Sequence, residues 1–167
     1  MEFKLRPWRM DDLPSLLQYA DNANIARNLT DKFPHPYSEE AGKGFLERVI
    51  QGNPPSVLAI DVDGVAVGAI GVHPQEDIMC RNAEMGYWLA EPFWGNGILS
   101  SAIPQMVRYG FEHFDIDRIY ARPFGSNRAS QRVLEKAGFV LEGRFEKTIY
   151  KWGRYEDELF YAVRRER

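Results

Sequence analysis

"EPFWGNGILSSA", residues 91–102, decides how the chain is interpreted. Two glycines, Gly95 and Gly97, stand directly before a run of small and apolar residues that begins a helix. A strand that runs into such a loop and then into a helix presents free backbone N–H groups where the partial positive charge favours an anion. Glycine lets a bulky diphosphate approach the backbone, and Ser100 adds a hydroxyl donor. The stretch predicts a phosphate-binding loop, with an ordinary tight turn as the alternative.

Periodicity on both sides of the loop predicts an α+β, or mixed α/β, domain. Alternating residues around Asp63-Gly64 indicate an antiparallel hairpin, while Ser38 and either Asp11 or Asp12 are placed to begin helices. Strands are expected at 3–8, 56–62, 65–73, 83–90, 117–124, 139–152 and 155–165, and helices at 11–22, 24–29, 38–51, 98–114 and 126–139. This order predicts a single central, mixed but mostly antiparallel sheet of about seven strands flanked by about four helices.

Size and charge limit the class of protein. The 167 residues fit a single domain spanning 1–167, and 44% hydrophobic with 27% charged residues is typical of a globular chain. The 21 basic and 24 acidic residues leave a net charge of −3, which is the wrong sign for general binding to nucleic acid. The basic C-terminal residues Arg164, Arg165 and Arg167, interrupted by Glu166, are expected to form a solvated tail.

The cysteine count and the apolar runs bear on the cellular compartment. Cys80 is the single cysteine, so an internal disulfide is excluded and a reducing compartment is favoured. The longest apolar run, residues 65–72, is much shorter than the roughly 20 residues of a membrane span. The expectation is a cytoplasmic protein that does not bind membranes.

Two other phosphate-binding motifs fit the glycine loop less well. The nucleoside-triphosphate P-loop requires Lys and then Ser or Thr after its last glycine, where Ile98 and Leu99 stand. A dinucleotide fingerprint requires Gly or Ala where Ser100 stands, although Asp115 or Asp117 lies at the distance of its ribose-binding acid. The preceding strand also belongs to an expected antiparallel meander rather than to a β-α-β unit. Dinucleotide binding therefore remains only an alternative.

Three separated motifs in the right order extend the interpretation to nearly the whole chain. They are "AEMGYWLAEPFWGNGILSSA" at 83–102, "NRASQRVLEKAGFVLEG" at 127–143 and "GRYEDELFYA" at 153–162. Together they resemble the GCN5-related N-acetyltransferase (GNAT) superfamily, and within it the RimJ/RimL-like group that acetylates protein N-terminal amines and other small amines. The resemblance implies an acetyl-CoA-dependent N-acetyltransferase in which an amine attacks the thioester directly in a ternary complex. A non-catalytic module that binds a CoA-like ligand or a protein partner is the alternative.

In that family a glycine loop of the form Q/R-x-x-G-x-G/A cradles the pyrophosphate of acetyl-CoA. The resemblance maps this loop onto Trp94, Gly95, Asn96, Gly97, Ile98 and Leu99, with Ser100 next. Trp94 replaces the polar first residue and Leu99 the small last one. Backbone amides make the contacts, so neither replacement forbids binding.

The resemblance also implies contacts to the pantetheine arm. The end of the preceding strand, Trp88, Leu89 and Ala90, is expected to pair with the pantetheine amides. Asn127 and Ser130 match the family's N-x-x-S motif, for which helix capping is the alternative interpretation.

The chemistry needs a base, an oxyanion donor and a proton for the thiolate. An α-amine has a pKa of about 8 and a lysine-type amine about 10.4, so an attacking amine must lose a proton. Glu84, on the strand that leads to the loop, is the expected base, with a structural carboxylate as the alternative. A backbone N–H near Leu89 is expected to stabilise the oxyanion. Ser130 is the first candidate to protonate the thiolate, because Leu134 stands where many relatives carry a tyrosine; Tyr150 or a water are alternatives.

Acceptor contacts are expected from the loop between the early helices and from the last hairpin. The candidates are Phe33, His35, Tyr37, Tyr150, Trp152 and Tyr155, each of which is equally explained by packing. The three histidines, His35, His73 and His113, have no metal-ligand spacing, so no metal is expected. The expected partner is an amine-bearing small molecule or protein N-terminus, with a homodimer left open.

Overall fold

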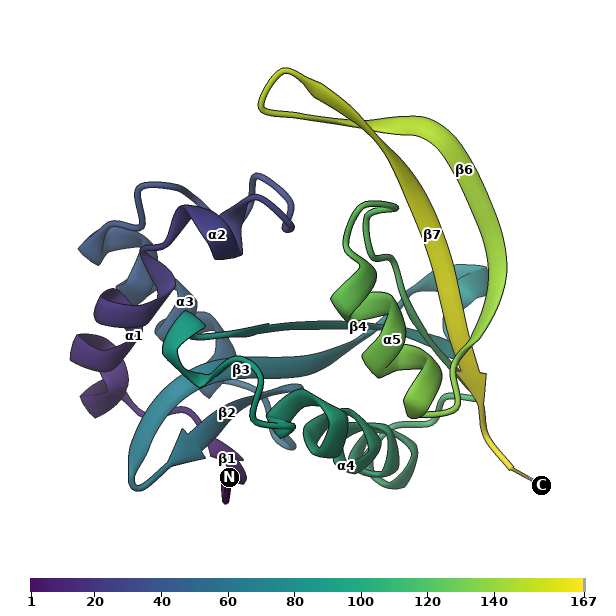
Figure 1. The fold of residues 1–167 in the computed structure, drawn as a ribbon. Helices are drawn as coiled ribbons and strands as arrows, with labels where there is room; N and C mark the ends of the chain where they lie inside the picture. The colour runs from purple at the N-terminus through teal and green to yellow at the C-terminus, as the bar shows by residue number, and fades with distance from the viewer. Residues whose placement is uncertain (167) are drawn as a thin grey trace. The chain divides into compact units, whose positions relative to one another are not determined.

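Strands and helices form where the hydrophobic periodicity predicts them, as a computed structural model of residues 1–166 describes (Figure 1). The strands are β1 (Lys4–Pro7), β2 (Val57–Val62), β3 (Val65–Pro74), β4 (Asn82–Leu89), β5 (Arg118–Ala121), β6 (Val140–Lys151) and β7 (Arg154–Arg164). The helices are α1 (Leu13–Ala20), α2 (Ala23–Ala26), α3 (Glu39–Ile50), α4 (Ile98–His113) and α5 (Arg128–Lys136). Three short 3-10 turns were not expected from the sequence: η1 (Met10–Asp12), η2 (Asp77–Met79) and η3 (Glu91–Phe93).

The strands are hydrogen-bonded in the order β1-β2-β3-β4-β5-β7-β6. β1 with β2, β2 with β3, β5 with β7 and β6 with β7 are antiparallel, whereas β4 and β5 are parallel over Asn82–Glu84. This confirms the predicted mixed, mostly antiparallel sheet of seven strands. The residues divide into two compact units, 1–71 with 87–102 and 72–86 with 103–167, so the single-domain organisation stays a prediction.

The first unit packs its helices around one apolar cluster. Figure 1 shows α1, α2 and α3 gathered together, and the buried side chains between them include Leu16, Ile25 and Leu46. Trp8 lies in the same cluster, edge-on to Phe45 with ring centroids 5.3 Å apart. Burial of a large aliphatic side chain contributes about 1.5–3 kcal/mol, so this cluster supplies the main stabilisation of the unit.

Arg6 joins two buried carboxylates beside this cluster. Its guanidinium donates to both oxygens of Asp12, at 2.8 and 2.9 Å, and to Asp61 at 2.6 Å. The three side chains are only 11%, 6% and 3% exposed. Asp12 is the N-cap residue of α1, as expected, but its side chain makes no capping bond to that helix because Arg6 and the Arg9 N–H already occupy it.

The first unit is expected to lose stability in acid because of this cluster. Burial, the largest single cause, raises the pKa of Asp12 and of Asp61, but the hydrogen bonds and charge of Arg6, together with a backbone N–H donor to each carboxylate and nearby positive charge, outweigh it and hold both pKa values below the usual range. Such carboxylates contribute stability that is fully present above the unfolded pKa of about 3.9 and is lost as pH falls through the folded pKa. Urea unfolding between about pH 5 and pH 2 should show a smaller loss in Asp61→Asn than in the parent; equal losses would contradict this assignment.

The second unit is built on a long curved hairpin of β6 and β7 (Figure 1). Its turn places Trp152 and Gly153 at φ values of +51° and +78°. β6 bulges between Phe145 and Ile149, where the Lys147 N–H donates to the Asp157 carboxylate at 3.0 Å. The long strands predicted around Gly153 are thus confirmed, but their register is irregular.

The C-terminal arginines of this unit correct one expectation. Arg165 donates to the carbonyls of Phe111, Phe114 and Ile116, and so satisfies the end of α4 and the loop that follows. Arg164 pairs with Glu142 at 3.1 Å. The prediction of a solvated tail was wrong for Arg165, because its guanidinium binds carbonyls distant in sequence; Arg164 remains 66% exposed, and Arg167 lies outside the described residues.

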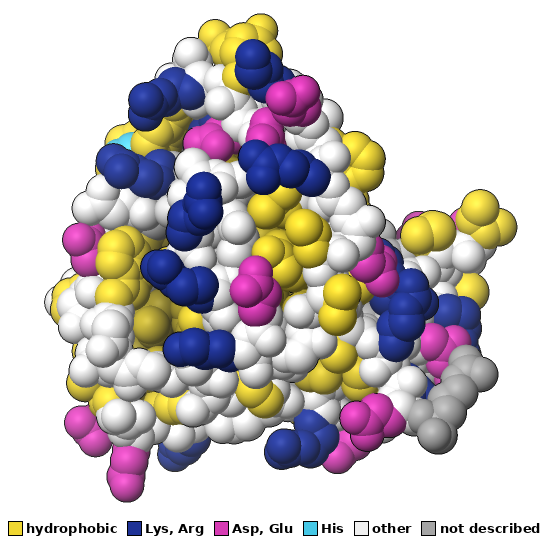
Figure 2. Space-filling model, turned by 45° about the vertical axis from the view of Figure 1, so that its right-hand side comes forward, with side chains coloured by type: hydrophobic (Ala, Val, Ile, Leu, Met, Phe, Trp, Pro, Cys, Tyr) yellow, Lys and Arg dark blue, Asp and Glu magenta, His cyan; other side chains and the backbone are white. Residues whose placement is uncertain are grey.

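The surface charges, the hydropathy of the helices and the possible metal ligands bear on the predicted partners. Figure 2 shows basic and acidic side chains side by side over the face drawn, so no single-sign patch covers that face. Among residues 1–166, no helix is both long and apolar enough to cross a membrane. No group of three or more His, Cys, Asp or Glu suited to a metal ion occurs in the same described part.

Candidate functional site

The glycine loop lies in the first unit, between the end of β4 and the start of α4. Gly95 and Gly97 have φ values of +77° and +75°, in the left-handed region that favours glycine. No other atom lies within 4 Å of the position that a Cβ would take at either residue. The loop backbone is therefore open, as both a ligand cradle and an exposed tight turn would be, so the phosphate-binding role stays a prediction.

The start of α4 adds unpaired donors to this loop. The helix begins at Ile98, whose side chain is buried, while Leu99 and Ser100 remain partly exposed. The first intrahelical bond runs from the Ser101 N–H to the Gly97 carbonyl at 3.3 Å. The N–H groups that precede it are those of a helix N-terminus, which attract an anion.

Trp94 fastens the loop to the strand. Its indole N–H donates to the carbonyl of Leu89 at 2.7 Å. Asn96 closes the turn from the other side, because its amide donates to the carbonyls of Phe93 and Trp94, each at 3.1 Å. The loop is thus held by side chains on both sides of Gly95.

The end of β4 is buried, and two of its backbone groups already form hydrogen bonds within the protein. Trp88, Leu89 and Ala90 are all buried, and the Ala90 N–H donates to the Val67 carbonyl at 2.8 Å. Gly68 lies against this strand so closely that a Cβ there would sit 2.5 Å from the Trp88 carbonyl oxygen. The Ala90 N–H and the Leu89 carbonyl are therefore engaged within the protein, which narrows the predicted pantetheine pairing to the other backbone groups.

In the second unit, Glu84 lies in an ion pair. Arg122 donates to both of its carboxylate oxygens, through Nε and, at 3.0 Å, through Nη2. Arg122 also approaches Glu158 at 3.4 Å. Burial and then the Glu84 charge raise the pKa of Tyr120, which is opposite Glu84 in the β4–β5 pairing. Glu84 as base stays a prediction. Because Arg122 donates to both of its carboxylate oxygens, Glu84 would have to give up one of these hydrogen bonds to accept a proton.

Asn127 and Ser130 come together at the start of α5. Asn127 is the N-cap, and its Oδ1 accepts the Ser130 N–H at 3.2 Å. The capping alternative is thus confirmed for Asn127, and it leaves the amide nitrogen of that side chain for other contacts. Ser130 is partly exposed in the first turn of the helix.

The predicted acceptor residues form two separate groups, one in each unit. In the first, Phe33 contacts Tyr37 and Trp88 with ring centroids 5.2 and 5.9 Å away, and Tyr37 is buried. His35 lies 3.7 Å from Asp21. In the second, the hairpin exposes its aromatic side chains: Tyr150 is 64%, Trp152 51% and Tyr155 66% exposed. Packing explains Phe33 and Tyr37, whereas the hairpin aromatics remain at the surface.

A comparison with known protein families shows which family the chain belongs to. The family model described as an acetyltransferase (GNAT) domain matches residues 2–140. The chain belongs to the GNAT family. The match includes the glycine loop, Glu84 and the N-x-x-S motif, whereas the third motif, residues 153–162, lies beyond it.

Individual GNAT relatives agree with this. The uncharacterized N-acetyltransferase YoaA of Bacillus subtilis (strain 168) is 37% identical over 97 residues, 58% of this chain and 54% of YoaA. The ribosomal-protein-serine acetyltransferase of Escherichia coli (strain K12) is 30% identical over 82 residues, 49% of this chain and 46% of that protein. The chain therefore matches about half the length of these curated relatives.

Similarity to solved structures covers more of the chain than similarity to these relatives in sequence. RimL, a ribosomal L7/L12 alpha-N-protein acetyltransferase solved in complex with coenzyme A, has a TM-score of 0.83 and 24% identity, covering 97% of this chain and 93% of RimL. At that identity the likeness establishes the GNAT fold alone.

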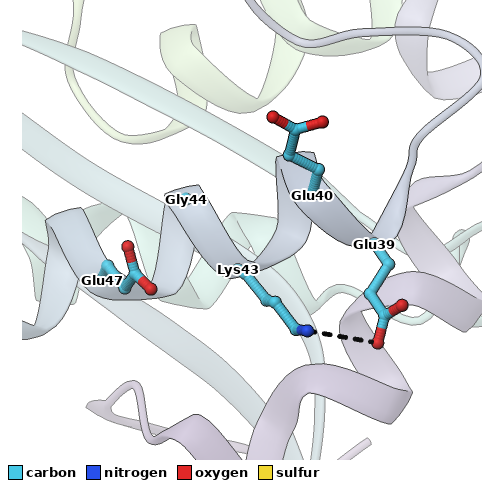
Figure 3. A pocket seen from close by; sticks show the side chains of 5 residues that line it. All are labelled: Glu39, Glu40, Lys43, Gly44 and Glu47. Atoms are coloured by element: carbon cyan, nitrogen blue, oxygen red, sulfur yellow. Dashed lines mark ion pairs between the residues drawn. The ribbon is translucent and has the colours of Figure 1, made fainter.

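A hollow on the surface of α3 lies elsewhere in the first unit (Figure 3). Glu39, Glu40, Lys43, Gly44 and Glu47 line it, and Lys43 pairs with Glu39 at 3.6 Å. All five residues come from one helix, and none belongs to the GNAT motifs. Its carboxylates would also repel a polyanion, so this hollow is not the candidate site.

Sequence reasoning missed three residues that hold the GNAT motifs in place. Arg122 holds Glu84, and the amides of Asn22 and Asn24 hold Glu91 beside the glycine loop. Asn22 stands before a short helical run, which indicates a capping residue, but Glu91, the partner of its amide, is 69 residues away.

Proposed function

We propose that this chain is an acetyl-CoA-dependent N-acetyltransferase of the RimJ/RimL-like group, and that both units act together as one acetyltransferase domain. The observation that carries the proposal is the open backbone at Gly95 and Gly97, in front of α4, in a GNAT family member. Two left-handed glycines with nothing above them suit a diphosphate that must approach the amides closely.

The loop and the strand end would hold acetyl-CoA, which supplies an acetyl group activated as a thioester. The N–H groups from Gly97 to Ser100 are assigned to the pyrophosphate. The Leu89 N–H is assigned to the thioester carbonyl oxygen, where a fixed donor is worth most as negative charge develops. Asn127 and Ser130 are assigned to the pantetheine arm.

The proposed transfer is direct and balanced in protons. The ammonium form of the amine first loses one proton. The neutral nitrogen then forms a bond to the acetyl carbon as the carbon–sulfur bond breaks, and it loses a second proton to solvent while the thiolate gains one. Glu84 is assigned as the acceptor of the first proton, directly or through a water, and Ser130 as the donor of the proton that the thiolate gains. No covalent acetyl-enzyme is required, and neither is a metal ion.

The acceptor is proposed to be a primary amine on a protein N-terminus or a small molecule. The E. coli relative is named for acetylating a ribosomal protein, which favours the protein N-terminus as the first acceptor to test. The aromatic side chains of the β6–β7 hairpin, with Phe33, His35 and Tyr37, are proposed to contact this substrate. A panel of amines and N-terminal peptides, assayed by released CoA, would identify the acceptor.

A side chain added to the glycine loop is expected to weaken acetyl-CoA binding. Gly97→Ala should lower acetyl-CoA affinity about tenfold or more, since the added methyl group stands where the diphosphate must approach. Gly64→Ala is the matched control, because Gly64 also has a left-handed φ, of +87°, and open space around it, but lies in the β2–β3 turn. Both variants carry a similar backbone strain of about 1–2 kcal/mol. Isothermal titration with acetyl-CoA measures the difference.

Two results would count against the proposal. Equal loss of acetyl-CoA affinity in Gly97→Ala and Gly64→Ala would mean that strain, not a cradle, explains the effect. Thermal stabilisation of the parent by NAD but not by acetyl-CoA would favour the dinucleotide alternative.

A further inference from the structure

Glu91 is held by two amides from a distant part of the first unit. The Nδ2 groups of Asn22 and Asn24 both donate to Glu91 Oε1, at 2.9 and 3.0 Å, and Asn24 also reaches Oε2 at 3.3 Å. These hydrogen bonds, first from Asn24 and then from Asn22, lower the pKa of Glu91, so the carboxylate is charged at neutral pH. Hydrogen bonds to a charged acceptor are about twice as strong as neutral ones.

Glu91 begins η3, the turn that leads into the glycine loop. Phe93 of the same turn packs edge-on against Tyr19 of α1, with centroids 5.9 Å apart. The Trp94 N–H donates to the Glu91 carbonyl at 3.0 Å. The glycine loop is thus connected to Glu91 by a hydrogen-bonded turn of three residues.

The residue that precedes Asn22 contacts the predicted acceptor segment, residues 33–37. Asn22 caps α2, since its Oδ1 accepts the Asn24 N–H at 2.8 Å. The preceding residue, Asp21, accepts the Tyr37 N–H at 3.0 Å and lies 3.7 Å from His35. Residues 21–24 therefore contact η3 on one side and the predicted acceptor segment on the other.

We propose that Glu91 is a positioning residue that couples the acetyl-CoA loop to the acceptor segment, so that bound acetyl-CoA orders residues 33–37 before the amine arrives. The inference rests on the proposed function. Its physical basis is that a loop held by a ligand holds Glu91, and a held carboxylate restricts Asn22, Asn24 and, through them, Asp21. A ligand changes a distant segment by its difference in affinity for the two states of the connecting element.

Hydrogen exchange measured with acetyl-CoA alone tests the coupling without knowledge of the acceptor. In the parent, saturating acetyl-CoA is expected to slow exchange of the backbone amides of residues 30–37 by about tenfold. Glu91→Ala should lose most of that slowing while its acetyl-CoA affinity changes by less than about threefold, because Glu91 itself is not assigned to the cofactor. Glu91→Gln should keep it, since both asparagine amides meet the one oxygen that an amide retains.

A charge exchange separates a specific contact from a general fold defect. Asn24→Asp places a second carboxylate against Glu91 and should abolish the slowing. Combining Asn24→Asp with Glu91→Gln restores an N–H to carboxylate contact and should recover it. Thermal unfolding of every variant, followed by circular dichroism, shows that each is folded at the temperature of the exchange experiment.

The outcomes distinguish the inference from the function on which it rests. If the parent binds acetyl-CoA and Glu91→Ala shows the same slowing as the parent, the coupling is overturned and the proposed function stands. If the Asn24→Asp and Glu91→Gln pair shows no recovery, the contact is not the connecting element and the coupling is likewise overturned. If the parent does not bind acetyl-CoA, the proposed function fails and the coupling fails with it.

Discussion

Arg6→Ala is expected to lower the free energy of unfolding by about 3–5 kcal/mol, the usual cost of leaving buried charges without a partner. Arg6 pairs with Asp12 and Asp61, which are 6% and 3% exposed, and its removal would leave both carboxylates buried without their ion-pair partner. Their remaining donors, the N–H groups of Arg9 and Gly64, carry no net charge. Urea unfolding at neutral pH, with the slope checked for two-state behaviour, measures the loss.

Two variants show whether burial is the cause. Lys43→Ala breaks a pair whose side chains are 53% and 66% exposed, and should change stability by less than about 1 kcal/mol. The triple variant Arg6→Met, Asp12→Asn, Asp61→Asn removes all three charges and keeps acceptor oxygens for Arg9 and Gly64, so it should recover most of the loss. Equal losses in Arg6→Ala and Lys43→Ala would contradict the argument from burial.

Glu84→Gln is expected to reduce turnover by about 10²- to 10⁴-fold, the range for removal of a general base, with acetyl-CoA affinity unchanged. Glutamine has nearly the same shape, but it cannot accept a proton from the amine near neutral pH. Glu142→Gln is the matched control in the same unit, because Glu142 likewise lies in an ion pair with arginine, here with Arg118 and Arg164, and has no assigned role in the reaction. Released CoA with the best acceptor of the panel measures turnover.

Three results would separate the candidate roles. Turnover of Glu84→Gln equal to that of the parent would show that Glu84 is not the base and that its pair with Arg122 is structural. An equal drop in Glu142→Gln would point to a general loss of fold. A parent that binds acetyl-CoA tightly and acetylates no amine of the panel would favour the non-catalytic module.

Local pattern predicted most of the fold, and the reasons are visible at particular residues. Ser38 accepts the Ala41 N–H at 3.1 Å and begins α3 as a capping residue should. Asp63 and Gly64 both take positive φ values, as a tight antiparallel hairpin requires. The η3 turn was not predicted because its three residues, Glu91–Phe93, carry no periodicity, and its place depends on contacts with α1 and α2.

The sequence predicted the backbone conformation of the glycine loop but not the side chains that support the predicted site. Gly95 and Gly97 take the open, left-handed conformation that the loop motif implies. The match to the family pattern was loosest at Trp94 and Leu99, and in the structure the indole N–H of Trp94 donates to the Leu89 carbonyl. Arg122 could not be connected to Glu84, since 38 residues separate them.

The sequence by itself determined the secondary structure, the antiparallel turn at Asp63-Gly64 and the glycine loop, because each follows from backbone preferences within a few residues. Only the tertiary structure decided that Glu91 is held by Asn22 and Asn24, that Arg6 lies between two buried carboxylates, and that Leu89 and Ala90 are already engaged. Polar side chains can pair with any suitable partner that the fold brings within about 3 Å, and sequence distance carries no information about which partner that is.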